Sequence, residues 1–168
     1  MILRESTKED QQSLERIYPA AFPDEDLLPV VRSLLTGSVD VLSLVAEDNG
    51  KVVGHVAFTI CSVGDVSVGL LAPLCVDPAQ HRQGIGSALV REGFKRLQER
   101  AIDKVLVLGD PRYYGRFGFA TERAIRPPYP MPEDWADAWQ FVSLGTGADQ
   151  IEGTLVVPDV WQNPALWG

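Results

Sequence analysis

The feature that most constrains the fold is a strand–helix–strand run between residues 67 and 110. SVGLLAPLCV (67–76) and KVLVLGD (104–110) are apolar, strand-like segments, and apolar residues between them repeat at helical spacing. A helix that connects two strands of one sheet makes those strands parallel. The sequence therefore predicts an α/β (α+β) fold in which at least one strand pair is parallel.

The remaining segments predict a sheet that is otherwise mostly antiparallel. A short strand opens at Ile2, and two amphipathic helices follow, the first starting after a Thr7–Asp10 capping pattern. Residues 41–61 read as a hairpin, because Asn49-Gly50 accepts the positive φ angles of a type I′ turn. FVSL (141–144) and IEGTLVV (151–157) are expected as closing strands. We expect one domain over residues 1–168, with helices on both faces of a twisted sheet.

Composition excludes several classes of protein. A formal net charge of −8 argues against a nucleic-acid-binding module, which normally carries a basic face. No apolar run reaches the roughly 20 residues of a membrane span, and MILRESTKED lacks the apolar core of a signal peptide. We therefore expect a cytoplasmic protein. With two histidines and two cysteines, Cys61 and Cys75, we expect no metal site and no disulfide framework.

A glycine-containing turn precedes the helix of the central run. The first amides of a helix have no intrahelical partners, and the helix dipole places positive potential there. Gly84 and Gly86 lack side chains that would keep a ligand away, Arg82 adds a charge, and Ser87 adds a hydroxyl. This combination predicts an anion site for a phosphate or pyrophosphate. It matches neither a P-loop nor the G-x-G-x-x-G dinucleotide motif.

Two motifs resemble those of the GNAT superfamily of acetyl-coenzyme A (acetyl-CoA)-dependent N-acetyltransferases. Its phosphate-binding signature, Gln/Arg-x-x-Gly-x-Gly/Ala after Val-x-Pro, corresponds here to His81-Arg82-Gln83-Gly84-Ile85-Gly86 after Val76-Asp77-Pro78. His81 departs from the first position of that signature. The aromatic motif that follows the next strand corresponds to Tyr113-Tyr114-Gly115-Arg116-Phe117-Gly118-Phe119. The resemblance is strongest over residues 67–120 and points to a bacterial subgroup of undefined substrate.

The resemblance implies how the cofactor is held. The pyrophosphate would lie on the N–H groups of residues 82–87, and strands 67–76 and 104–109 would splay apart. The pantetheine arm would then pair with the backbone of Leu74 and Val76. The N–H group of Leu74 or of Cys75 would bind the thioester carbonyl and its developing oxyanion. Sequence parity leaves both of these amides open.

The resemblance also implies a proton donor for the leaving thiolate. Tyr114 occupies the position where the family places this acid. The alternative is that Tyr114 packs on the cofactor or in the core. Phe117 is expected to pack beside the cofactor arm or in the core.

The sequence does not single out a general base. Glu47, His55, Asp77 and Asp110 are candidates, and an ordered water is a further one. For His55 a core histidine with satisfied hydrogen bonds is the competing interpretation, and for Asp110 a turn residue before a proline. The acidic segment Asp24-Glu25-Asp26 either contacts the substrate or caps the following helix.

We predict transfer of acetyl from acetyl-CoA to a primary amine, of a small molecule or a protein, by direct attack in a ternary complex. No base accompanies Cys75 in the sequence, which argues against a covalent acetyl-cysteine. The alternatives are a CoA-binding sensor without turnover and a nucleotide-binding protein. The Trp135–Trp139 pair and the Trp161–Trp167 tail are expected in an acceptor pocket or in a homodimer surface. For Trp135 and Trp139, which are at helical spacing, simple packing is the alternative.

Overall fold

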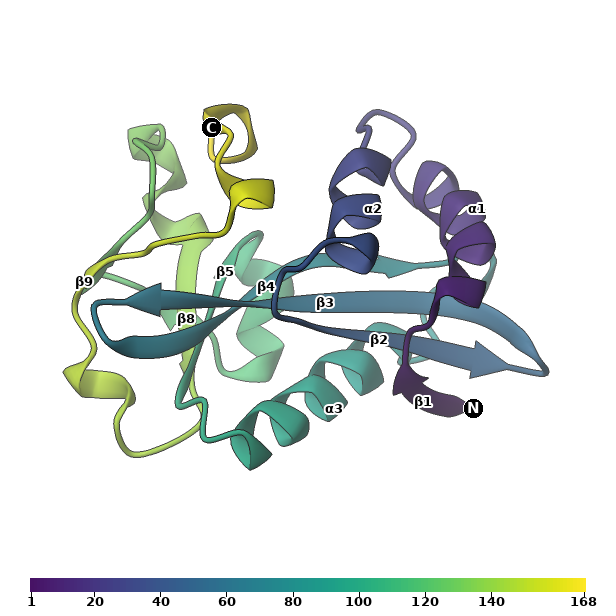
Figure 1. Ribbon diagram of the computed structural model, residues 1–168, viewed down its shortest axis with the longest axis horizontal. Coiled ribbons are helices and arrows are strands. Elements are labelled where there is room, and N and C mark those ends of the chain that lie inside the picture. The colour runs from purple at the N-terminus through teal and green to yellow at the C-terminus, as the bar shows by residue number, and fades with distance from the viewer. The chain divides into compact units, whose positions relative to one another are not determined.

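The computed structural model describes residues 1–168 (Figure 1). Its α-helices are α1 (Gln11–Ala21), α2 (Leu28–Thr36), α3 (Ile85–Glu99) and α4 (Pro111–Tyr114). Its strands are β1 (Ile2–Glu5), β2 (Val41–Asp48), β3 (Lys51–Val63), β4 (Val66–Val76), β5 (Lys104–Leu108), β6 (Ala120–Thr121), β7 (Ile125–Arg126), β8 (Trp139–Ser143) and β9 (Gly153–Thr154). Short 3-10 turns fill many of the connections.

Seven strands form one sheet in the order β1-β2-β3-β4-β5-β8-β6, and β7 pairs with β9 separately. The β1–β2, β5–β8 and β6–β8 pairs are antiparallel. In contrast, β4 and β5 are parallel, with Gly69 opposite Val105 and Leu70 opposite Leu106. The predicted mixed, mostly antiparallel sheet with a parallel pair around the connecting helix is therefore confirmed.

Local sequence signals explain several element boundaries. Asn49 and Gly50 have φ angles of 51° and 75°, as the predicted hairpin turn between β2 and β3 requires. Pro29 lies in the first turn of α2, where its missing N–H leaves no intrahelical hydrogen bond unmade. Thr7 N–H donates to the Asp10 carboxylate at 2.8 Å, which is half of the predicted capping pattern.

The chain divides into two compact units, and the first comprises residues 1–58 and 72–94. Neighbouring residues of β3 point to opposite faces of the sheet in this unit. A Cβ atom on Gly54 would lie 2.9 Å from Ile85 of α3, whereas the side chain of His55 reaches Tyr18 of α1. Helices thus cover both faces of β3, as expected.

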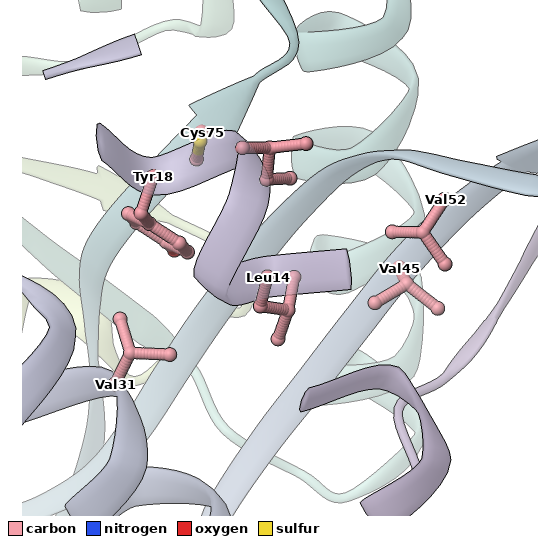
Figure 2. Close-up of a cluster of buried hydrophobic side chains, with 7 residues drawn as sticks. Leu14, Tyr18, Val31, Val45, Val52 and Cys75 are labelled. Atoms are coloured by element: carbon pink, nitrogen blue, oxygen red, sulfur yellow. The ribbon is translucent and has the colours of Figure 1, made fainter. Parts of the chain in front are cut away.

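One cluster of the first unit's core joins α1 and α2 to the sheet (Figure 2). Its members are apolar or weakly polar side chains that are nearly inaccessible to solvent. They are Leu14, Ile17, Tyr18, Val31, Val45, Val52 and Cys75.

The second unit comprises residues 59–71 and 95–168. Three of its tryptophans, Trp139, Trp161 and Trp167, are buried, and each indole N–H donates to an acceptor in the same unit. Simple packing, the alternative for Trp139, describes that residue, and Trp161 and Trp167 are also buried in the core rather than placed at a surface. Trp135 is exposed and lies in a 3-10 segment, so the expected helical spacing with Trp139 is wrong.

The predicted strand over residues 151–157 is also largely wrong. Only Gly153–Thr154 forms a strand, and Val156 forms an isolated bridge with Ser62. Leu155 N–H donates to the Arg126 carbonyl, so the segment satisfies its backbone against two different partners rather than in one ladder.

Candidate functional site

The end of β4 carries Leu74, Cys75 and Val76, the three residues proposed to hold the cofactor arm and the thioester. Leu74 and Val76 are half-buried, whereas the Cys75 side chain is buried. Burial, with a smaller contribution from Asp77, raises the pKa of the Cys75 thiol to about 12. A neutral buried thiol is a poor nucleophile, because the thiolate is the reactive form.

The segment after β4 is fixed by Asp77. Its carboxylate accepts from Ala79 N–H at 3.1 Å and pairs with Arg16 of α1 at 3.0 Å. Arg16 also donates to the Val52 carbonyl at 3.1 Å. Burial opposes ionisation, but the Arg16 and Ala79 hydrogen bonds hold the pKa of Asp77 below its usual value. Asp77 is therefore a structural anchor with poor basicity.

The turn that opens α3 has the backbone of an anion-binding concavity. Arg82 and Gly84 have φ angles of 65° and 76°, and a Cβ atom on Gly84 would meet nothing within 4 Å. Alternation of left-handed residues with others points successive N–H groups to one side. Residues 85–87 open α3, where helix amides have no intrahelical acceptors, and Ala88 N–H is already bonded to the Gly84 carbonyl at 3.0 Å.

His81 is the residue that departs from the family signature at this turn. Its side chain folds back, and Nε2 lies 3.1 Å from the Val76 carbonyl oxygen. His81 therefore braces the end of β4 against the turn. Residues 74–87, including Gln83, Gly86 and Ser87, are brought together in the first unit as one continuous segment.

The aromatic motif forms a compact group in the second unit. The rings of Tyr114 and Phe117 have centroids 6.3 Å apart, and Tyr113 and Phe119 lie edge-on to Tyr114. A Cβ atom on Gly109 would lie 2.4 Å from the Tyr114 ring. Only glycine at this position leaves room for the ring to pack against the end of β5. Burial, together with Tyr113, raises the pKa of Tyr114. Its hydroxyl is therefore protonated at neutral pH and able to donate.

Two of the carboxylates considered as general base are occupied. Asp110 caps α4, accepting from the backbone N–H of Arg112 at 2.9 Å and pairing with its guanidinium at 3.2 Å. The Arg112 side-chain and backbone hydrogen bonds lower the pKa of Asp110. Glu47 pairs with Arg4 at 3.3 Å. Each carboxylate is thus engaged by an arginine.

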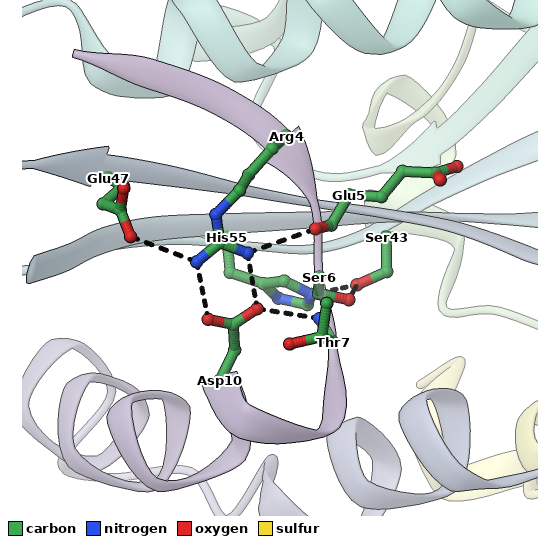
Figure 3. Close-up of polar contacts among 8 residues, drawn as sticks. All are labelled: Arg4, Glu5, Ser6, Thr7, Asp10, Ser43, Glu47 and His55. Atoms are coloured by element: carbon green, nitrogen blue, oxygen red, sulfur yellow. Dashed lines mark hydrogen bonds and ion pairs between the residues drawn. The ribbon is translucent and has the colours of Figure 1, made fainter. Parts of the chain in front are cut away.

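His55 of β3 is fully buried, and both ring nitrogens are engaged. Nδ1 lies 2.6 Å from the Tyr18 hydroxyl, and Nε2 lies 2.8 Å from the Ser43 hydroxyl. Burial lowers the pKa of His55 to about 4, although the nearby Asp10 carboxylate acts to raise it. Figure 3 shows His55 with Ser43, and Asp10 paired with Arg4. The interpretation as a core histidine with satisfied hydrogen bonds describes this arrangement.

Sequence reasoning missed the partners of His55. Ser43 lies in β2, and Tyr18 lies in α1, the first of the two amphipathic helices that the sequence predicts. No local pattern links side chains that are 12 and 37 positions away from the histidine. The one usable signal was a histidine inside an apolar strand, which requires buried hydrogen-bond partners.

The acidic segment Asp24-Glu25-Asp26 lies between α1 and α2 and does not cap α2. The N-cap residue is Leu27, and no side chain hydrogen-bonds there. The capping interpretation is therefore wrong. The segment borders a pocket of about 280 Å³ together with Tyr18 and Phe22.

No group of three or more His, Cys, Asp and Glu side chains is arranged to hold a metal ion. None of the helices combines the length and the apolar character needed to cross a bilayer.

Comparisons with known proteins agree on one family. Residues 9–119 match the profile of the acetyltransferase (GNAT) family. The Escherichia coli K12 protein called uncharacterized N-acetyltransferase YjhQ is 32% identical, over 95% of this chain and 93% of its own length.

Two solved structures share the fold over nearly the whole chain. The E. coli N-acetyltransferase YhbS in complex with CoA has a TM-score of 0.85 at 27% identity, covering 96% of this chain and 92% of that one. A GNAT family acetyltransferase from Brucella melitensis in complex with acetyl-CoA has a TM-score of 0.77 at 27% identity, covering 96% and 97%.

Proposed function

This chain belongs to the acetyltransferase (GNAT) family, and we propose that it transfers the acetyl group of acetyl-CoA to a primary amine by direct attack. The observation that carries the proposal is the turn that opens α3. Arg82 and Gly84 adopt left-handed conformations there, and the following amides lack helical partners. Such a turn suits a pyrophosphate. Solved relatives of this fold contain CoA or acetyl-CoA.

In the proposed complex, residues 81–87 hold the pyrophosphate, and the backbone of Leu74 and Val76 pairs with the pantetheine arm. The N–H group of Leu74 or of Cys75 stabilises the oxyanion that forms when the amine attacks. Bound acetyl-CoA would supply the thioester, and the protein would supply orientation, hydrogen bonds and proton transfer.

Tyr114 is the proposed acid. A phenol that stays protonated at neutral pH donates its proton to the departing thiolate, which leaves as a thiol. Phe117, whose ring packs close to that of Tyr114, is proposed to support the ring and the cofactor arm.

Direct attack is proposed over a covalent acetyl-cysteine because the two thiols, Cys61 and Cys75, are buried. Burial raises the pKa of each thiol to about 12. Neither thiol supplies a thiolate at neutral pH.

The first experiment is calorimetric titration of acetyl-CoA into the protein, followed by thiol release over a panel of primary amines. We expect binding, and release of thiol with at least one amine. Initial rates measured against both substrates should give intersecting lines. Binding without release would favour a CoA sensor, and absence of binding would overturn the assignment of the turn.

Arg82→Gly tests the turn without disturbing it, since glycine tolerates a φ of 65°. Loss of the guanidinium should weaken acetyl-CoA binding about 10-fold, as expected for one charge-assisted hydrogen bond. Asn49→Gly is the matched control, because Asn49 is also left-handed, with a φ of 51°, but lies in the β2–β3 turn. Equal affinities in all three proteins would remove Arg82 from the phosphate site.

Tyr114→Phe tests the acid. The turnover rate should fall about 100-fold, within the usual range for loss of a general acid, while acetyl-CoA affinity is retained. Tyr113→Phe is the control, since this neighbouring ring lies 5.0 Å from Tyr114 and is not the proposed donor. Unchanged turnover in Tyr114→Phe would contradict the assignment.

A further inference from the structure

Four polar side chains of the first unit form a continuous chain of hydrogen bonds. The Tyr18 hydroxyl lies 2.6 Å from His55 Nδ1, and His55 Nε2 lies 2.8 Å from the Ser43 hydroxyl. The Ser6 hydroxyl lies 2.7 Å from that of Ser43. Figure 3 shows the part of this chain from Ser6 through Ser43 to His55. The chain links α1, β3, β2 and the residue that follows β1.

Each end of the hydrogen-bonded chain borders a surface pocket. Ser6 and Ser43 line a pocket of about 250 Å³ together with the Glu5 side chain. Tyr18 lines the pocket of about 280 Å³ between α1 and α2. Tyr18 also belongs to the same buried cluster as Cys75 of β4, the strand to which we assign the thioester (Figure 2).

The chemistry of these groups allows protons to move in either direction. A hydroxyl donates one hydrogen bond and accepts others, and a neutral imidazole donates through one nitrogen and accepts through the other. His55 is neutral at physiological pH because burial lowers its pKa to about 4. The hydrogen-bonded chain therefore has two arrangements. In one, every hydrogen bond is donated toward Ser6, and in the other, every hydrogen bond is donated toward Tyr18.

We propose that Tyr18, His55, Ser43 and Ser6 form a proton relay that carries the proton released by the acceptor amine to water beside Ser6. The inference rests on the proposed acetyl transfer and supplies the base that the sequence did not single out. The carboxylates considered for that role are ion-paired or cap a helix turn.

The proton transfers balance without leaving a charge in the core. The amine N–H bond breaks, its electron pair remains on nitrogen for attack, and the proton joins the Tyr18 oxygen. The former phenol proton moves to His55 Nδ1, the Nε2 proton moves to Ser43, and the Ser43 proton moves to Ser6. Ser6 releases its own proton to water. Once the product has left, Ser6 takes up a proton from water, the transfers run backward, Tyr18 releases a proton to water, and the first arrangement returns.

The charged group near the relay is the Asp10 carboxylate, and it is ion-paired with Arg4. Asp10 accepts two hydrogen bonds of 2.8 Å from Arg4, which also pairs with Glu47. This ion cluster lies beside His55 and outside the chain of hydroxyls. It offers the relay no competing proton acceptor.

Ser43→Ala interrupts the relay at its centre with a small change in volume. With the amine that the panel shows to be turned over fastest, we expect kcat to fall about 100-fold and acetyl-CoA affinity to be unchanged. The solvent deuterium isotope effect on kcat should also change. Plotted against the deuterium fraction of the solvent, kcat should no longer show the curvature expected when several protons move together. Ser43→Thr should restore both, because it returns a hydroxyl.

Thr59→Val is the matched control. Thr59 is a fully buried hydroxyl of β3 that accepts from the Trp161 indole at 3.0 Å and takes no part in the relay. This variant should keep its kcat and its isotope effect. Unaltered turnover in Ser43→Ala, or an equal fall in Thr59→Val, would overturn the relay. Failure of the proposed reaction looks different, because the unaltered protein would then release no thiol.

A second measurement needs no acceptor. The chain has two histidines, so nitrogen-15 NMR of His81→Gln reports His55 alone. We expect both His55 tautomers in exchange, and a single tautomer once Ser43→Ala is added. A single fixed tautomer before that change would show a static hydrogen-bond network and would overturn the proposal.

Discussion

The two compact units each bury a polar cluster, and the two clusters have opposite chemistry. In the first unit, His55 is surrounded by hydroxyls that each donate and accept. In the second unit, Lys104 of β5 pairs with Glu122 at 2.5 Å, and both side chains are buried. Burial alone therefore does not tell what a polar cluster does.

Further contacts surround the Lys104–Glu122 ion pair. The second carboxylate oxygen of Glu122 accepts from Ala124 N–H at 2.6 Å and from Ile125 N–H at 3.0 Å. The Lys104 ammonium lies 4.4 Å from the centre of the Phe141 ring. An ammonium donates only and a carboxylate accepts only, so the direction of these bonds is fixed. Such a pair ties β5 to the turn after β6, whereas the hydroxyl chain is reversible.

The largest effect is expected where the fixed cluster is broken. Lys104→Met leaves the Glu122 charge buried without its partner, which should lower the free energy of unfolding by about 3–5 kcal/mol. The double variant Lys104→Met/Glu122→Gln removes both charges and should recover a large part of this loss. Urea unfolding measures both. If Lys104→Met lowered the free energy of unfolding no more than a typical surface variant does, the pair would not stabilise the second unit.

The His55 cluster should reveal itself through pH. The unfolded histidine gains its proton near pH 6.5, whereas the folded one does so near pH 4. The unfolded state thus binds more protons between these values, and the free energy of unfolding falls as pH drops through that window. A shift of this size corresponds to about 3 kcal/mol. Asp10 stays ionised there, because the Arg4 hydrogen bond lowers its pKa below 3.8.

Urea unfolding between pH 4 and 7 measures this dependence. His55→Gln should flatten the curve, whereas Thr59→Val, which removes a buried hydroxyl and no titrating group, should leave the slope as it is. A slope that survives in His55→Gln would assign it to another group.

The smallest effect is expected at Ser6, the end of the hydrogen-bonded chain that borders the pocket of about 250 Å³. Ser6→Ala removes one half-buried hydrogen bond in a pocket that water enters, so the free energy of unfolding should fall by no more than about 1 kcal/mol. Ser143→Ala, which deletes an exposed hydroxyl bonded to the Gly145 carbonyl, is the stability control. Thermal unfolding of the two variants should nearly coincide. A much larger loss in Ser6→Ala would make Ser6 part of the core.

Sequence signals predicted what depends on neighbours along the chain. The Asn49-Gly50 turn and the start of α3 after the glycine turn were predicted, because each is encoded within a few residues. The parallel β4–β5 pair followed from the length and periodicity of their connection. These features are determined by residues close in sequence and do not depend on tertiary contacts.

What escaped prediction depends on partners distant in sequence. The hydrogen-bond partners of His55 come from two other elements, and the acidic segment does not cap α2, although its composition favours capping. The 151–157 segment carries strand-like residues, yet its hydrogen bonds go to Arg126 and Ser62 in turn. For His55 and for residues 151–157, tertiary partners decide what the local sequence does not.

The burial of both cysteines has a practical consequence for assays. Cys61 and Cys75 are 4% and 1% exposed, and burial raises the pKa of each thiol to about 12. In the folded protein a thiol-reactive dye therefore meets almost no background, and its signal counts released CoA. Once the chain unfolds, both thiols react, so the same reagent becomes a stoichiometric reporter of unfolding. One colorimetric readout thus follows turnover and integrity in a single sample.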